Sequence, residues 1–431
     1  MLFPLIHIAV AGALSAQSGV LDPAFEKIPL NRWLSEAGHS RIRWSATVSP
    51  AVLSYQQRMR VRVSIRVDGR DLLPLRGQGQ LLMLVQYRDH NGLVYQNHSS
   101  VDLRTLDEHV KSVDMVWDLD AFVLPGEYGI AFAVYHPTTG EHGTTQRTLR
   151  VDALKGDPFA DAWRENPAVE FLEVKDPPES WYLPSLSGGF CLPLETHRPV
   201  HIDLLLNSTP TELAPSSQGS ASDQNLAVLL PVLKVLTQID LRNGTTDATV
   251  LDLLQQRASF EQHNVRRLDW ERLKAALADA KTNTVDARSL GNRRQMAQFF
   301  VHEVSRRISD ASESRGSPRP LRILIVLSGP MAFSSQADLH PIEARSDPDF
   351  RVYYIRCQPT ILRYIPPALT SGRGRRGLAT GRPASGTVFQ ADQMDSLENM
   401  IKPLKPRVFE VRSPHEFRNA LGTMIQEISR D

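Results

Sequence analysis

Three short apolar runs in the second half of the chain limit its fold more than any other feature. They are "VHIDLLL" (200–206), "LRILIVL" (321–327) and "FRVYYIR" (350–356). A continuous apolar run of this length is typical of a strand that is buried on both faces. Stretches with helical spacing lie between the first and second runs, at 225–239, 270–280 and 293–308. The pattern predicts a doubly wound, Rossmann-like α/β domain over residues 198–431, with a mainly parallel sheet.

Further elements of this domain are visible in the sequence. Residues 248–254 and 257–262 have the pattern of a strand pair, and "RVFEV" (407–411) that of a last strand. The final helix has a clear start signal, because Ser413 and Glu416 have the spacing of a capping box and Pro414 occupies the first helical position. We therefore expect the chain to end in an amphipathic helix.

The first half of the chain has a different period. In "RMRVRVSIRV" (58–67) and "EYGIAFAVYH" (127–136) every second residue is apolar, which is typical of strands with one buried face. Turn sequences separate several such strands, so residues 41–153 are predicted to form an antiparallel, immunoglobulin-like β-sandwich. Residues 154–197 are rich in Pro, Gly and Trp and are expected to be an irregular connector. The predicted fold class is thus an all-β domain followed by an α/β domain.

The N-terminus reads "MLFPLIHIAVAGALSAQSG", with an apolar stretch from Leu2 to Ala16. This stretch is similar to a signal peptide covering residues 1–16, although it lacks a basic start; a buried N-terminal strand is the alternative. It is too short for an ordinary membrane-spanning helix, so no membrane span is expected. The expected location is therefore exported, either periplasmic or extracellular.

Charge and cysteine content narrow the function classes. The formal net charge is +1, which argues against a general electrostatic grip on nucleic acid. The two cysteines, Cys191 and Cys357, are in no zinc-binding spacing. They are either a single disulfide or two separate buried thiols.

The sequence lacks several common catalytic motifs. No GxxxxGK[ST] phosphate loop and no GxSxG elbow are present. "VHEVSRR" (301–307) begins like a zinc-binding HExxH motif but has Arg306 at the position of the second histidine. We expect a protein that is not an enzyme. The alternative is an uncharacterised hydrolytic enzyme with a nucleophile or acid near Ser328 or Thr284.

The α/β half resembles the von Willebrand factor A-type domain, in the divergent form found in exported bacterial proteins. The resemblance covers residues 198–431 and rests on the element order, on "VHIDLLLNSTPT", on "LRILIVLSGPMAF" and on "RVFEVRSPHEFRNALGTMIQEI". The stretch "LPGEYGIAFAVYHPTTGEHGTTQRTLRV" is similar to the β-sandwich that accompanies such domains.

The resemblance also implies a set of binding residues at one edge of the sheet. Metal-competent members carry D-x-S-x-S after the first strand, a threonine in a later loop and an aspartate at the end of the fourth strand. The matching positions here, which we call the rim, are Asn207, Thr209, Thr211, Thr284 and Ser328. Both carboxylates of the family pattern are therefore replaced by neutral side chains.

This replacement determines the expected function. Mg²⁺ gives up its water reluctantly, and neutral oxygens offer it little charge compensation, so no metal or other cofactor is expected at the rim. We expect an exported, adhesion-type module that binds an unknown protein partner through a degenerate, metal-free rim. The alternative is a structural component of an envelope or secreted assembly.

Overall fold

The computed structural model describes residues 21–36, 41–163, 165–172, 183, 189–209, 221–265, 267–281, 293–313, 319–331, 341–343, 347–358 and 395–430. Contacts divide the chain into two compact units. The first comprises residues up to 50 together with 61–153 and 167–171, and the second comprises 51–60, 154–166 and 172–431. The expected signal peptide, 1–16, lies outside the described residues.

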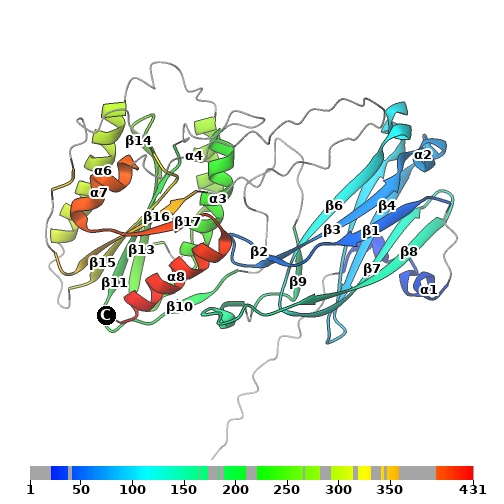
Figure 1. Ribbon diagram of the computed structural model, residues 1–431, viewed down its shortest axis with the longest axis horizontal. Helices are drawn as coiled ribbons and strands as arrows, with labels where there is room; N and C mark the ends of the chain where they lie inside the picture. The colour runs from blue at the N-terminus through cyan, green and yellow to red at the C-terminus, as the bar shows by residue number, and fades with distance from the viewer. Residues whose placement is uncertain are drawn as a thin grey trace, which may run out of the picture. The chain divides into compact units, whose positions relative to one another are not determined.

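The first unit contains two antiparallel sheets (Figure 1). One has the order β1 (Trp44–Val48), β3 (Met59–Asp68), β6 (Asp114–Val123) and β9 (Val169–Phe171). The other has the order β5 (Val94–Asp102), β4 (Gln80–Arg88), β7 (Gly126–His136) and β8 (Glu141–Val151). The Tyr87 and Phe171 rings, one from each sheet, meet at a centroid distance of 5.6 Å, so the sheets pack face to face.

Burial along the strands of the first unit follows the sequence pattern. In β3, the apolar side chains from Met59 to Val67 are buried and the residues between them are more exposed, as the alternation predicts. In β7, Ala131 and Ala133 on the second face are also buried, because α1 (Leu30–Ser35) packs over them with Trp33. The remaining helical segments of this unit are short: η1 (Pro23–Phe25), α2 (Gly69–Leu72), η2 (Leu73–Leu75), η3 (Leu103–Thr105) and η4 (Glu108–Ser112).

The second unit is built on a six-stranded sheet (Figure 1). Its order is β14 (Arg257–Gln262), β13 (Gly244–Asp252), β11 (Val200–Asn207), β15 (Leu321–Ser328), β16 (Phe350–Cys357) and β17 (Arg407–Val411). Every neighbouring pair is parallel except β13 and β14. The apolar runs in the sequence are thus confirmed as strands of one buried sheet. A separate parallel pair joins β10 (Leu192–Leu194) to β12 (Ile239–Leu241).

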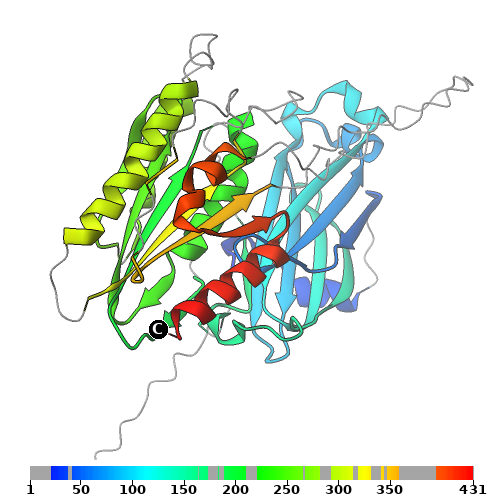
Figure 2. The same ribbon diagram turned by 60° about the vertical axis from the view of Figure 1, so that its left-hand side comes forward.

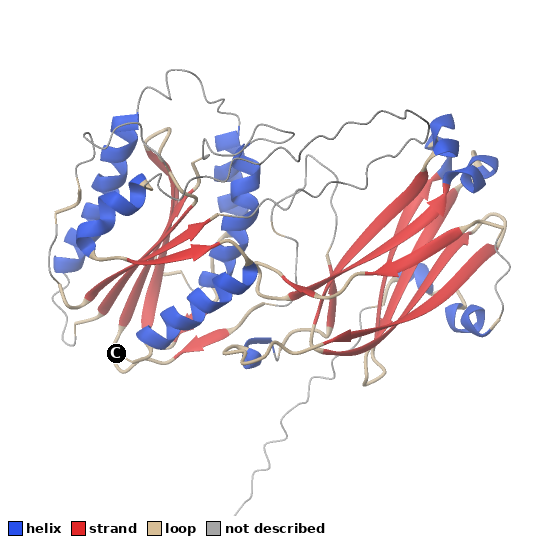
Figure 3. Cartoon of the chain, in the orientation of Figure 1, coloured by secondary structure: helices blue, strands red, loops and turns tan. Residues whose placement is uncertain are grey.

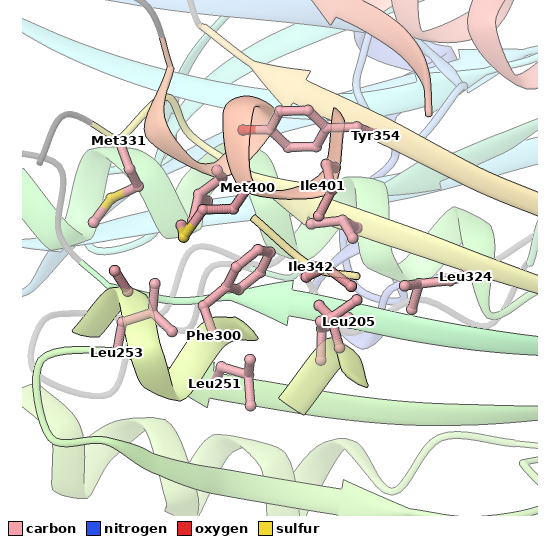
Figure 4. Close-up of a cluster of buried hydrophobic side chains, with 14 of the residues drawn as sticks. Leu205, Leu251, Leu253, Phe300, Leu324, Met331, Ile342, Tyr354, Met400 and Ile401 are labelled. Carbon is pink, nitrogen blue, oxygen red and sulfur yellow. The ribbon is translucent and has the colours of Figure 1, made fainter. Parts of the chain in front are cut away.

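Helices lie on both sides of this sheet (Figure 3). They are α3 (Ala221–Leu236), α4 (Trp270–Lys281), α6 (Arg293–Glu313), α7 (Ser396–Ile401) and α8 (Pro414–Ile428), with η5 (Ala160–Trp163) and η7 (Lys402–Leu404) as shorter turns. Figure 2 shows α6, the long yellow-green helix, running along one face of the sheet. Its side chains meet those of Leu205, Leu251 and Leu324 in an apolar cluster that α7 closes (Figure 4). Burial of this cluster supplies the main driving force for joining helices to sheet.

The expected connector, 154–197, contains regular structure. Its residues Val169–Phe171 extend a sheet of the first unit by pairing with β6, and Leu192–Leu194 pairs with β12 in the second. Phe190 packs edge-on against Phe159 and Trp163. Short extended segments of this kind carry little periodic signal, so their composition alone does not distinguish them from a loop.

The cysteines are both free thiols. Cys357 is buried at the end of β16, and burial raises the pKa of its thiol. Cys191 is exposed, so only one of the two fits the description of a buried thiol.

The capping box predicted for the last helix is confirmed. The Ser413 hydroxyl accepts a hydrogen bond from the Glu416 backbone N–H at 3.3 Å, and the Glu416 carboxylate accepts one from the Ser413 N–H at 3.1 Å. The helix also holds a buried, positively charged side chain, that of Arg418. Arg418 pairs with Asp157 and lies over the rings of Phe159 and Trp163.

Replacing the helix cap tests its contribution. Ser413→Ala removes one acceptor for an otherwise unpaired N–H, so the free energy of unfolding should fall by about 1 kcal/mol. Thr423→Ala is the control within the same helix, because the Thr423 hydroxyl only donates back to the Asn419 carbonyl at an exposed position. Urea unfolding followed by circular dichroism measures both; equal losses in the two variants would contradict a specific role for the cap.

Candidate functional site

The order of the strands marks one edge of the large sheet as a candidate site. Numbered along the chain, the six strands follow the spatial order 3-2-1-4-5-6, so β11 and β15 lie side by side while their connections lead away in opposite directions. In open α/β sheets, ligands bind outside the carboxyl ends of the strands at such a switch point. Asn207 and Ser328 are the last residues of these two strands.

The two residues are joined directly. The Asn207 side-chain Nδ2 donates to the Ser328 Oγ at 2.9 Å, and the Ser328 hydroxyl donates to the Gly329 carbonyl at 2.6 Å. Asn207 is 1% exposed and Ser328 is 0% exposed. The register pairs Leu206 with Leu327, which places the following residues opposite each other at the edge. A hydrogen bond between side chains thus continues the ladder beyond its last paired residues.

Thr209 and Ser208 connect the same edge to the neighbouring turn. The Thr209 N–H donates to the Asn207 Oδ1 at 3.1 Å, and the Thr209 Oγ1 accepts from the Leu253 N–H at 2.8 Å. The Ser208 hydroxyl donates to the Leu251 carbonyl at 3.0 Å. All of these side chains are buried. Their hydrogen bonds resemble those of turn-forming Asn and Ser side chains, which satisfy nearby backbone groups.

The structure therefore brings together part of the predicted rim. Asn207, Thr209 and Ser328 lie at the carboxyl edge of β11 and β15, and Asn207 contacts both of the others. Thr211 and Thr284 lie outside the described residues.

The three described rim residues do not fit a Mg²⁺ ion. Each offers a neutral oxygen, and each of these oxygens already accepts a hydrogen bond within the protein. A hard divalent cation needs oxygens that are free to face it, and it gains most from carboxylates. An ion here would share these buried oxygens with their present hydrogen-bond donors, and none of the three side chains would offset its charge.

Ser328 also lacks the arrangement of an activated nucleophile. A catalytic serine hydroxyl donates its proton to a general base. The Ser328 hydroxyl instead donates to a backbone carbonyl, while its oxygen accepts from an amide.

A buried carboxylate near this edge is the residue that sequence reasoning missed. Asp395 caps α7 and accepts hydrogen bonds from the Tyr354 hydroxyl at 2.5 Å and from the Met331 and Leu397 N–H groups. Met331 follows Ser328 by three positions, so Asp395 fixes the chain that leaves β15. Burial raises the pKa of the Asp395 carboxyl, although these hydrogen bonds and Arg356 favour its charged form. The spacing of Asp395 and Glu398 was the available signal, since it is that of a helix cap.

Comparisons with known proteins add no family. No protein-family model matches the chain, and no curated protein matches it. A solved structure described as "X-ray structure of Northeast Structural Genomics Consortium target SoR45" aligns with 26% of this chain and 90% of its own, at 11% identity and a TM-score of 0.15. At that TM-score the likeness carries no argument about fold or function. Among the described helices, none combines the length and apolar character needed to cross a bilayer.

Removing the Asn207 side chain tests the joint between the two strands. Asn207→Ala leaves the buried Ser328 hydroxyl and Thr209 N–H without this partner, so the free energy of unfolding should fall by about 1–3 kcal/mol. Asn243→Ala is the matched control, because Asn243 is exposed just before β13. Urea unfolding measures both variants. An equally small change in the free energy of unfolding for both would contradict a structural role for the Asn207 side chain.

Asp395 should make stability depend on pH. A carboxyl whose pKa is higher in the folded than in the unfolded state binds its proton more tightly when folded. Stability from this group therefore falls as pH rises from the unfolded pKa, about 3.9, to the raised folded pKa. Asp395→Asn abolishes this titration, so the stability of the original chain minus that of the variant should be greatest at low pH and decrease toward neutral pH. Urea unfolding across this range measures the difference; one that increases with pH would contradict the assignment.

Proposed function

We propose that the second unit is a von Willebrand factor A-type domain, and that the chain is an exported protein-binding component whose rim works without a cation. The strand order with its antiparallel edge strand β14 and the helices on both faces support a Rossmann-like domain. The two face-to-face antiparallel sheets support an immunoglobulin-like first domain. Export rests on the apolar N-terminal sequence alone.

The hydrogen bond between Asn207 and Ser328 is the observation that carries the proposal for the rim. In a metal-competent domain of this type, these two positions hold carboxylates that need a cation between them. Here an amide and a hydroxyl bond to each other directly, at 2.9 Å. Neutral groups at this edge thus satisfy each other without a cation. In this proposal the partner contacts the turns around the edge.

The turn between β13 and β14 is a described part of this edge that a partner can reach. Leu254, Gln255 and Gln256 are partly exposed there. The turn is held in place by the bond from the Leu253 N–H to Thr209. Its position therefore depends on the rim, although the rim side chains themselves are buried.

Photocrosslinking tests whether this edge binds a protein. The full chain carrying a benzophenone amino acid at Gln255 is irradiated in an extract of its native cells, with and without EDTA. We expect an adduct of one defined mass that forms equally in both conditions, because no cation takes part in the contact.

The same label at Asn243 is the control, since Asn243 precedes β13 at the opposite edge and is exposed. Loss of the Gln255 adduct in EDTA would overturn the cation-free contact. Equal adducts from both positions, or none from Gln255, would overturn binding at this edge.

A further inference from the structure

A second group of polar side chains lies at the other end of the same strands. His201 and Asp203 are two residues apart on β11, so they point to one face of the sheet. Asp247 lies directly opposite Asp203 on the neighbouring strand β13. We call these three residues the amino-edge cluster. Six residues of extended chain separate His201 from Asn207, about 20 Å, so the cluster is distinct from the rim.

The three side chains converge on one point. The His201 Nε2 lies 3.4 Å from an Asp203 oxygen and 3.9 Å from an Asp247 oxygen, and the three ligand atoms lie within 4.8 Å of one another. Zinc binds such atoms at about 2.0–2.2 Å in a tetrahedron, which sets neighbouring ligand atoms about 3.4 Å apart. The first distance already has this value, the second is about 0.5 Å longer, and the two carboxylate oxygens, which lie within 4.8 Å of each other, need to approach by up to about 1.4 Å.

Each member of the cluster is oriented by a partner outside it. The His201 Nδ1 lies 2.7 Å from the Thr245 hydroxyl, which can accept its proton in a hydrogen bond. Arg322 contacts the Asp203 oxygen that faces away from His201. Asp247 accepts hydrogen bonds from the Asn264 N–H at 2.9 Å and from His263 at 2.8 Å. Metal ligands in proteins are positioned by outer contacts of this kind, especially at the second nitrogen of histidine.

The Nε2 of His201 has two candidate occupants. With Nδ1 donating to Thr245, the Nε2 lone pair faces two carboxylates, which are acceptors only. Either a proton or a metal ion must lie between these atoms to make the arrangement favourable.

Charge at the cluster favours a cation. Two carboxylates face the His201 Nε2, and Arg322 lies 3.4 Å from one of them. Arg307 is paired with Glu303 at 2.9 Å. When His201 and His263 are neutral, the two carboxylates outweigh the single positive charge of Arg322, so the group carries net negative charge.

We propose that the amino-edge cluster binds Zn²⁺ through the His201 Nε2, one oxygen each of Asp203 and Asp247, and a water molecule as fourth ligand. One imidazole and two carboxylates suit zinc, whereas Mg²⁺ and Ca²⁺ prefer sites of oxygen alone. The His201 and Asp247 side chains are 20% and 19% exposed, which leaves a path for the ion to enter.

Metal titration of the full chain tests the proposal. After treatment with a chelator, the chain is titrated with Zn²⁺ by calorimetry and with Co²⁺ by absorption, where four-coordinate Co²⁺ gives intense visible bands. We expect one ion per chain for each metal. His201→Gln and Asp247→Asn should each weaken Zn²⁺ binding by at least about tenfold. Circular dichroism of both variants checks that their secondary structure is unchanged.

His197→Gln is the matched control, because His197 is exposed just before β11 and outside the cluster. It should leave Zn²⁺ affinity unchanged. Absence of stoichiometric Zn²⁺ binding would overturn the proposal and would mean that a proton occupies the His201 Nε2. A loss of Zn²⁺ affinity in His197→Gln equal to that in the cluster variants would also overturn it. Failure of the crosslinking experiment at Gln255 has no bearing on this result, since that experiment probes the opposite edge.

Discussion

The parallel ladder between β11 and β15 is the interaction on which the second unit depends. Seven residue pairs join the strands, from Val200 with Leu321 to Leu206 with Leu327. Because side chains alternate, one face of β11 presents His201 and Asp203, then Leu205, then Asn207. The strand therefore has a polar group at each end and an apolar centre that packs against α6 and α7. The rim takes its geometry from this pair, and the amino-edge cluster takes its geometry from the pairing of the same strand β11 with β13.

The polar side chains at the two ends of β11 are satisfied in different ways. At the carboxyl end, neutral side chains satisfy one another and the local backbone, so the edge gains nothing from an added ion. At the amino end, two carboxylates face one imidazole nitrogen, and their second oxygens are held from outside. Neutral pairs are complete by themselves, whereas like charges at close range require a counterion. Residue type at each end thus decides which of them can take a cation.

Much of the fold could be predicted because the relevant signals are local. Continuous apolar runs marked β11, β15 and β16, and Ser413 with Glu416 marked the start of α8. The pairing of Asp203 with Asp247 could not be predicted, because it depends on strand order and register across 44 residues of chain. The sequence predicted that Asn207 and Ser328 lie at this edge. It did not predict their burial or the hydrogen bond between them, because these also depend on the register of two strands far apart in the chain. Asp395 had a cap signal, yet its contact with Tyr354 is tertiary.

The anchoring of α8 has a consequence for how the chain reaches this structure. Gln57 donates to the Pro414 carbonyl at 3.2 Å and accepts from Arg418, and residues 51–60 belong to the second unit. These contacts join positions more than 350 residues apart, a separation that makes closure slow and entropically costly. During synthesis, Gln57 emerges more than 350 residues before the helix that it contacts. The contacts of Gln57 with α8 can therefore form only after nearly all of the second unit has been synthesised, and a chain cut before residue 414 lacks them.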